Sequence, residues 1–242
     1  MKFLNLGCGT QVSHHSEVIN IDFHPILRIK LNFILRFFAR FWLSKSRYNK
    51  MISLPSNIKL YDLSKGIPYP NGSIDIIYHS HLLEHLARDQ AIMFLRDCYS
   101  KLTPRGIIRI CVPDLEILIR NYITSFEHYK ENLDNQIDHE KSIYKLIEQM
   151  TRQEASGTSK QHFLIRKIEN IILGSAEKRG ETHKWMYDSI SLRTILKSIG
   201  YRDIKICKYN SSRIKNWPQY GLDITSNGKE YKPGSLYVEA IK

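Results

Sequence analysis

Short apolar runs alternate with amphipathic stretches along most of the chain. The runs that predict β-strands cover 2–6, 17–22, 57–61, 73–78, 107–112, 202–209 and 235–241. Between the fourth and fifth runs, apolar residues recur every three or four positions from Leu82 to Leu102, which predicts a helix. A further helix is expected over 190–199, with Ser189 as its N-cap and Gly200 at its end.

This alternation predicts the fold class. Strands that alternate with helices are typical of α/β proteins, in which a mostly parallel sheet carries helices on both faces. We therefore expect one domain over residues 1–242, built on a Rossmann-like, doubly wound sheet. The polar, charge-rich stretch 115–182 contains no strand candidate, so we expect it to form a helical cap inserted after the fifth strand.

Composition excludes a disordered or low-complexity chain, since 42% of the 242 residues are hydrophobic and only 12 are glycine. The net charge of +12 is local. Eight Lys and Arg residues and no Asp or Glu lie between Phe23 and Tyr61, and the rest of the chain carries an excess of only +4. We therefore expect a basic, amphipathic insertion over 24–56.

Three interpretations of this insertion stay open. A helix over 26–43 could lie across the sheet with its arginines in solvent. Alternatively, Phe and Trp beside Lys and Arg, without acids, are typical of a helix at an anionic membrane surface, here through residues 26–50. Binding of nucleic acid ranks third, because the cations could neutralise phosphates but the aromatic residues are crowded with aliphatic ones.

The first predicted strand ends in the loop Gly7-Cys8-Gly9, and ligands of parallel sheets bind beyond the carboxyl ends of the strands. Two glycines allow a tight turn and bring the backbone close to a ligand. Val12 stands where a dinucleotide-binding Gly-x-Gly-x-x-Gly loop has its third glycine, which weighs against that kind of site. Asp22 ends the second strand, where its carboxylate could accept hydrogen bonds from ribose hydroxyls.

Further motifs follow in order. Asp62 ends the third strand, His79-Ser80-His81-Leu82-Leu83-Glu84-His85-Leu86 follows the fourth, and Leu102-Thr103-Pro104-Arg105-Gly106 leads into the fifth. With the glycine loop, these motifs resemble class I S-adenosylmethionine-dependent methyltransferases, in particular small bacterial methyltransferase-domain proteins. The resemblance covers 2–22, 58–114 and 183–242. The chain departs from the family at Gln11, where a third glycine is frequent, at Asn5, which replaces an acid, and in its short loop 10–16.

The resemblance implies S-adenosyl-L-methionine as the cofactor and methyl transfer to an oxygen or nitrogen of an acceptor that the sequence does not identify. The cofactor-binding residues that it implies are Leu6, Gly7, Cys8, Gly9, Asp22, Asp62, Leu63 and His79. In this scheme Gly7 and Gly9 line the methionine, Asp22 holds the ribose, and Asp62 with Leu63 borders the adenine.

Histidines and an acid gather after the fourth strand, and imidazoles with a carboxylate can bind zinc or iron. His79 and His81 belong to the strand end, however, whereas His85 already belongs to the following helix, so we expect no metal. A histidine near the methyl group suits the role of general base for a hydroxyl acceptor. We expect His81 to be this base, with His79 as the second candidate.

Acceptor contacts are expected from His85, Asp114, His183, Trp185 and Tyr187. For Asp114, the alternative is the N-cap of the helix that follows it. For the segment 183–188, closure over the acceptor and packing of its own loop both stay open.

The four cysteines are dispersed and form no Cys-x-x-Cys pair, so neither a disulfide framework nor a thiolate zinc site is expected. No uncharged apolar stretch reaches 18 residues, and the N-terminal stretch lacks the apolar length of a signal peptide. We expect a cytoplasmic protein, alternatively peripheral at the membrane, that acts on a small molecule or on a glycan or lipid-linked intermediate. Two rival functions stay open: an RNA-modifying or RNA-binding protein, and a catalytically silent binding module.

Overall fold

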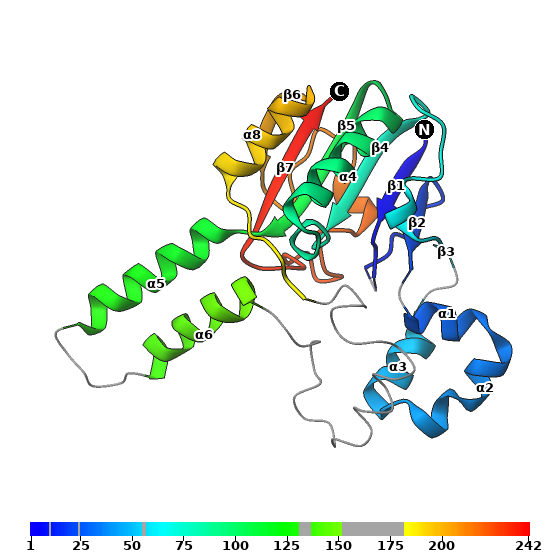
Figure 1. Cartoon of the computed structure of the whole chain (residues 1–242), viewed down its shortest axis with the longest axis horizontal. Helices are drawn as coiled ribbons and strands as arrows, with labels where there is room; N and C mark the ends of the chain where they lie inside the picture. The colour runs from blue at the N-terminus through cyan, green and yellow to red at the C-terminus, as the bar shows by residue number, and fades with distance from the viewer. Residues whose placement is uncertain (10, 24, 55–56, 131–136, 152–181) are drawn as a thin grey trace.

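The computed structural model describes residues 1–9, 11–23, 25–54, 57–130, 137–151 and 182–242. A seven-stranded sheet in the order β3-β2-β1-β4-β5-β7-β6 forms its centre (Figure 1). The strands are β1 (Phe3–Leu6), β2 (Val18–Asp22), β3 (Ile58–Leu60), β4 (Ile74–Ser80), β5 (Leu102–Pro113), β6 (Arg202–Cys207) and β7 (Ser235–Ile241). Neighbours from β3 to β5 are parallel, whereas β7 is antiparallel to both β5 and β6. The predicted Rossmann-like, mostly parallel sheet is therefore confirmed.

The strand order defines where a ligand can bind. From β1 the chain moves outward to β2 and β3, then returns to the other side of β1 to form β4. The carboxyl ends of β1 and β4 therefore flank the topological switch point, the usual place of ligands in open α/β sheets.

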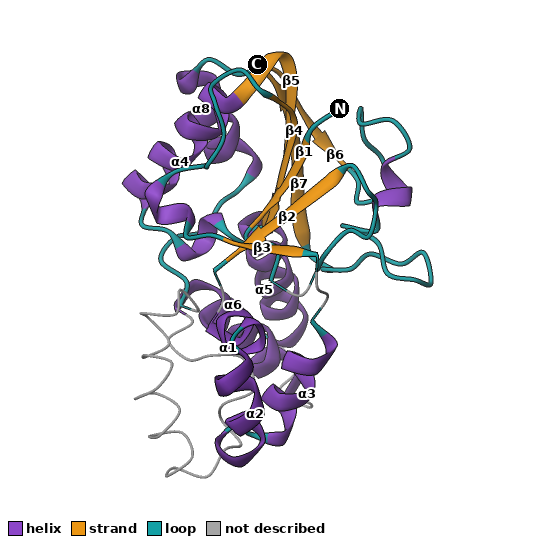
Figure 2. Cartoon of the chain, turned by 90° about the vertical axis from the view of Figure 1, so that its right-hand side faces the viewer, coloured by secondary structure: helices purple, strands orange, loops and turns teal. Residues whose placement is uncertain are grey.

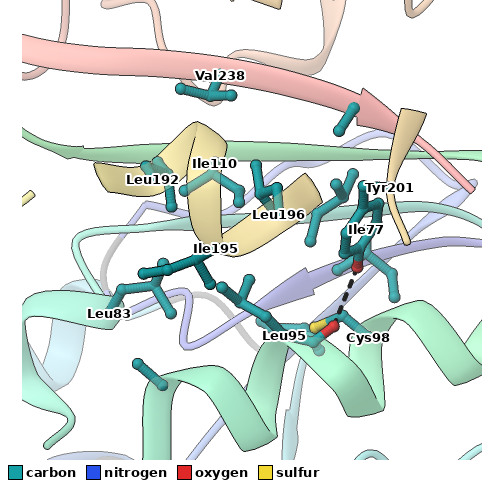
Figure 3. Packing of buried hydrophobic residues seen from close by; sticks show 14 of the residues in the cluster. Ile77, Leu83, Leu95, Cys98, Ile110, Leu192, Ile195, Leu196, Tyr201 and Val238 are labelled. Atoms are coloured by element: carbon teal, nitrogen blue, oxygen red, sulfur yellow. Dashed lines mark hydrogen bonds between the residues drawn. The ribbon is translucent and has the colours of Figure 1, made fainter. Parts of the chain in front are cut away.

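Helices α4 (Arg88–Lys101) and α8 (Ser189–Ile199) cover one face of the sheet (Figure 2). Between them and the strands lies the largest cluster of buried apolar side chains; Figure 3 labels Ile77, Leu83, Leu95, Cys98, Ile110, Leu192, Ile195, Leu196, Tyr201 and Val238. The Tyr201 hydroxyl donates to the Leu95 carbonyl at 3.1 Å, which ties β6 to α4. This contact anchors the edge of the sheet to its helical layer.

The N-cap of α8 differs from the prediction. Asp188, not Ser189, is the N-cap: its carboxylate accepts from the Ser191 backbone N–H at 2.7 Å, and the Ser191 hydroxyl reaches the Asp188 backbone N–H at 3.1 Å. This reciprocal capping box outcompetes a serine one position later, because it satisfies two backbone donors at once. The predicted end at Gly200 is confirmed, with φ +115°.

The opposite face of the sheet differs from the prediction that helices cover both faces. In the part of the chain that the structure describes, this face is covered by the irregular segment 208–234, which contains one 3₁₀ turn, η4 (Trp217–Tyr220). Arg109 of β5 points into this layer with no solvent exposure, and forms ion pairs with Asp223 at 2.8 Å and Glu239 at 2.6 Å. Its guanidinium also donates to the backbone carbonyls of Lys208 and Ser211, each at 3.0 Å.

The basic insertion forms three short helices beyond the carboxyl ends of β2 and β3: α1 (Pro25–Leu31), α2 (Phe33–Trp42) and α3 (Lys45–Ser53). The Asn32 side chain interrupts the predicted single helix, since it accepts from the backbone N–H groups of Ile34 and Leu35 and starts α2. The buried residues of the insertion pack with Cys8 of the glycine loop and Ile58 of β3. A helix laid across the sheet is therefore wrong: the insertion sits at the edge of the sheet, beside the switch point.

Two helices of the predicted cap are described, α5 (Leu115–Tyr129) and α6 (Ile137–Thr151), and they lie side by side (Figure 1). The remainder of the predicted insertion, residues 131–136 and 152–181, lies outside the described residues. None of the described helices is both long enough and apolar enough to cross a bilayer.

Candidate functional site

A cleft of about 250 Å³ opens at the carboxyl ends of β1 and β4. The residues that line it are Asn5, Gly7, Cys8, Gly9, Gln11, Tyr78, Ser80, His81, His85, His183, Tyr231 and Lys232. A larger groove of about 720 Å³ lies between α8 and β6, but none of the predicted site residues borders it. The cleft at the switch point is therefore the candidate site.

The glycine loop is bonded directly to the second strand. The backbone N–H groups of Gly7 and Cys8 donate to the Ile21 carbonyl, and that of Gly9 donates to the Asp22 carboxylate at 2.7 Å. Gly7 has φ +62°, so any other residue there would strain the backbone, and its Cβ atom would lie 2.9 Å from the Leu82 side chain. Burial and the nearby Asp22 carboxylate raise the pKa of the Cys8 thiol well above its usual value, so this thiol stays protonated.

A buried amide network holds the loop after β1 in place. Asn5 of β1 donates to the Gln11 carbonyl at 3.0 Å and to the Asn20 side chain at 2.9 Å. Asn20 of β2 in turn bonds both backbone groups of Ser13, whose carbonyl also accepts from Asn57. From the sequence, Asn5 stood out only because it replaces an acid of the family that the chain resembles. An asparagine in the middle of each of two short apolar strands was the signal for a buried polar network.

Asp62 and Leu63 follow β3 at the same edge of the sheet. The Asp62 carboxylate caps the 3₁₀ turn η1 (Leu63–Lys65), since it accepts from the Ser64 backbone at 3.0 Å and from its hydroxyl at 2.7 Å. The backbone N–H of Tyr61 donates to the Asp22 carbonyl at 3.0 Å. The glycine loop, Asp22 and Asp62 therefore stand side by side at the ends of β1, β2 and β3, in the order that the resemblance implied.

The two histidines predicted as bases lie in different surroundings: His79 is buried against α4, and His81 lines the cleft. His79 has no solvent exposure, and its ring packs against Phe94 of α4 at 5.4 Å. Burial lowers the pKa of His79 to about 4, an effect that the Glu84 charge only partly offsets. His81 follows the end of β4 with φ +50° and lines the cleft. Of the two, only His81 borders the cleft, so we do not propose His79 as the base, and its contact with the cofactor stays a prediction.

His81 is held between two partners. Its Nδ1 atom lies 3.0 Å from Oε1 of Glu84, and its Nε2 atom lies 3.0 Å from the Ser235 hydroxyl. Burial raises the pKa of Glu84, but the hydrogen bond from His81 and the charges of His81 and His85 outweigh it, so the pKa lies below its usual value. The carboxylate is therefore ionised and acts only as an acceptor.

Glu84, which lies in the 3₁₀ turn η2 (Leu83–His85), also fixes the segment that carries His183. The Glu84 carbonyl accepts from the backbone N–H of Lys184 at 2.7 Å. This contact brings the His85 and His183 rings to a centroid distance of 4.8 Å. His183 also reaches the Gln149 carbonyl of α6 at 2.6 Å. The predicted acceptor residues His85 and His183 are thus both brought to the cleft.

The other three predicted acceptor residues lie elsewhere. The Asp114 carboxylate accepts from the Glu116 backbone N–H at 2.9 Å, which confirms the N-cap interpretation; an acceptor contact stays a prediction. Tyr187 is buried, burial raises its pKa to about 12, and its backbone pairs with the start of α5. Trp185 is exposed and stacks with Arg88 at 5.1 Å. Neither aromatic residue borders the cleft.

Sequence reasoning missed several residues of the cleft wall: Gln11, Ser80, Tyr231 and Lys232. Tyr231 and Lys232 belong to the loop before β7. The antiparallel β7 brings this loop to the carboxyl end of β5, and no local pattern in the sequence signals that return.

No protein-family model matches the chain, and no curated protein matches it. Solved structures similar to it include a SAM-dependent methyltransferase from Archaeoglobus fulgidus, with 16% identity, TM-score 0.43 and coverage of 100% of this chain and 86% of that one. Another is a SAM-dependent methyltransferase, possible histamine N-methyltransferase, from Thermotoga maritima, at 11% identity, TM-score 0.43 and 100% and 82% coverage. At such identities and TM-scores, the function proposed below rests on the geometry of the site.

Proposed function

We propose that the chain is an S-adenosylmethionine-dependent methyltransferase that moves a methyl group to an oxygen or nitrogen of its acceptor. One observation carries this proposal. The glycine loop that ends β1 is bonded to Asp22 at the end of β2, and the same loop borders a cleft with an oriented His81. A nucleoside-binding edge and a basic nitrogen therefore meet at the switch point.

The residues present fit the cofactor. Gly7 and Gly9 leave the backbone open to a ligand, and Asp22 with Asp62 offers carboxylates along the adjacent strand ends. The cleft, at about 250 Å³, is smaller than small-molecule sites usually are, roughly 300–1,000 Å³. We therefore place the methionine end in the cleft and the adenosine over the ends of β2 and β3. When bound, the cofactor supplies an electrophilic methyl group on a sulfonium.

His81 is the residue that we propose to remove the acceptor proton. Because ionised Glu84 can only accept a hydrogen bond, Nδ1 of His81 carries the proton and Nε2 is the basic nitrogen. The Ser235 hydroxyl, 3.0 Å from Nε2, can also donate to the Lys232 carbonyl at 2.7 Å. It can therefore turn away from Nε2 when an acceptor arrives.

The basic insertion supports an acceptor at a membrane surface. Phe33, Phe37 and Phe41 recur every four residues along α2 and are 75%, 65% and 69% exposed. Exposed large apolar side chains beside arginines, in an acid-free stretch, complement an anionic bilayer surface. The insertion packs directly on Cys8 of the glycine loop. We therefore propose that it docks on anionic lipid and that the acceptor is a lipid-linked intermediate.

Calorimetric titration with S-adenosylmethionine and S-adenosylhomocysteine tests the proposed function. We expect one site per chain and at least 10-fold weaker binding by Asp22→Asn. The reason is that the ribose loses its hydrogen bond to a charged acceptor, a contribution of about 1.5–3 kcal/mol to the free energy of binding. Asp203→Asn, at an exposed acid on β6, is the matched control and should bind as the wild type does. Absence of binding by the wild type would refute the proposal, as would equal affinity of the Asp22→Asn variant.

A further inference from the structure

Three side chains with metal-binding atoms meet at the inner end of the cleft. Glu84 and His85 come from η2, and His183 comes from the segment before α8. One ligand atom from each lies within 4.8 Å of the other two. Sequence reasoning had grouped His85 with His79 and His81 and expected no metal. The fold instead groups it with His183, which is almost one hundred residues away in the chain.

The carboxylate of this cluster has one compensating partner, His81. Glu84 has no solvent exposure, and no donor besides His81 is placed on its oxygens within the part of the chain that the structure describes. Nδ1 of His81 lies 3.0 Å from Oε1. Burying an ionised carboxylate is costly unless a cation or several donors compensate it. A bound cation would supply what this site lacks.

Both imidazoles are oriented as metal ligands usually are. Nδ1 of His85 lies 3.0 Å from the Thr182 carbonyl, and Nδ1 of His183 lies 2.6 Å from the Gln149 carbonyl. A carbonyl can only accept, so each Nδ1 carries the proton and each Nε2 keeps its lone pair. A backbone carbonyl that fixes the tautomer in this way is typical of histidines that bind a metal through the other nitrogen.

We propose that Glu84, His85 and His183 bind a divalent transition-metal ion through one carboxylate oxygen and the two Nε2 atoms. Two histidines and one glutamate with an open position form a ligand set of catalytic zinc sites. Because His85 and His183 line the cleft, the open position faces the acceptor. The metal ion would bind the acceptor oxygen there and lower the pKa of its hydroxyl, so that His81 removes the proton more easily. This role rests on the proposed function.

Metal titration of the full chain after treatment with a chelator tests the site. We expect one Zn²⁺ per chain by calorimetry, and one Co²⁺ with the intense visible absorption of a tetrahedral site. His85→Ala and His183→Ala should each weaken Zn²⁺ binding by at least about 100-fold. His128→Ala, at an exposed histidine of α5, is the matched control and should leave the affinity unchanged.

Two results would overturn the site: a wild type that binds neither ion stoichiometrically, or ligand variants that bind Zn²⁺ as tightly as the wild type. The first result needs no variant and is therefore independent of any folding defect. Titration with S-adenosylmethionine in the presence of chelator separates this proposal from the proposed function. Cofactor binding without metal binding refutes only the metal site, and metal binding without cofactor binding refutes only the methyltransferase.

Discussion

Nδ1 of His81 lies 3.0 Å from Oε1 of Glu84, whose side chain has no solvent exposure, whereas that of His81 is 22% exposed. This pairing places an oriented imidazole at the cleft surface over a fixed, buried carboxylate. It depends on the left-handed backbone of His81, φ +50°, which turns the chain from β4 into η2. An acid that orients a base is the arrangement expected for proton removal from an acceptor.

His81→Asn should abolish most of the methyl transfer and leave cofactor affinity unchanged. Asparagine tolerates the left-handed backbone but provides no basic nitrogen. We expect the rate to fall by about 10²- to 10⁴-fold, the usual contribution of a general base. Release of S-adenosylhomocysteine in the presence of the acceptor measures the rate, and calorimetry measures the affinity. An unchanged rate would remove His81 from the mechanism.

Arg109→Met should strongly destabilise the fold. The substitution leaves Asp223 and Glu239 buried without their cation, a loss of about 3–5 kcal/mol in the free energy of unfolding. Urea unfolding followed by circular dichroism measures it. Arg96→Met, on an exposed position of α4, should change the same quantity by less than about 0.5 kcal/mol.

A triple variant distinguishes lost pairing from lost packing. Adding Asp223→Asn and Glu239→Gln to Arg109→Met removes the orphaned charges, so part of the stability should return. If the triple variant is no more stable than Arg109→Met alone, unpaired charge is not the reason for the loss.

Acid should destabilise the protein through His79. Its pKa is about 4 in the folded state, because burial disfavours the charged ring, and about 6.5 in the unfolded chain. Protonation therefore favours the unfolded chain: the stability is complete above pH 6.5 and decreases by about 3 kcal/mol as the pH falls to 4. Urea unfolding between pH 4 and 7, in chelator, measures this decrease. His79→Leu should show a smaller decrease than the wild type, and parallel curves would contradict this assignment.

The aromatic stripe of α2 should be required for binding to anionic lipid. We expect the wild type to sediment with vesicles that contain phosphatidylserine, and Phe33→Ser/Phe37→Ser/Phe41→Ser to remain in the supernatant, because three exposed apolar anchors are lost. A matched control replaces Ile117, Ile119 and Ile123, partly exposed apolar residues of α5, by serine and should sediment normally. A wild type that never sediments with these vesicles excludes the membrane proposal.

Most of the sheet could be predicted from the sequence, because each strand carries a local signal. The runs around β1, β2, β4 and β5 are mostly apolar, and those of β2, β4 and β5 are rich in β-branched residues. Gly7, Gly72 and Pro113 mark ends of the runs of β1, β4 and β5. The end of α8 at Gly200 was equally local. The predicted N-cap of α8 was wrong because two neighbouring residues compete for that position. Asp188 and Ser189 are both good caps, and only the geometry of Ser191 decides between them.

The site was predictable only where it lies next to a strand end. Gly7, Asp22 and His81 follow strands whose parallel register carries them to one edge. The grouping of Glu84 with His183, and that of Arg109 with Asp223, joins residues that are about one hundred positions apart. Such contacts follow from the return of the chain to the sheet before α8 and before β7, which hydrophobic periodicity does not encode.

Hydrogen–deuterium exchange with and without S-adenosylhomocysteine tests the central claim most directly, because it locates the cofactor as well as detecting it. We predict slower exchange in residues 5–13, 20–23 and 79–85, and no change along the groove at 190–204. Unchanged exchange at the three strand ends, or slowing confined to 190–204, would contradict the assignment of the switch-point cleft as a methyltransferase site.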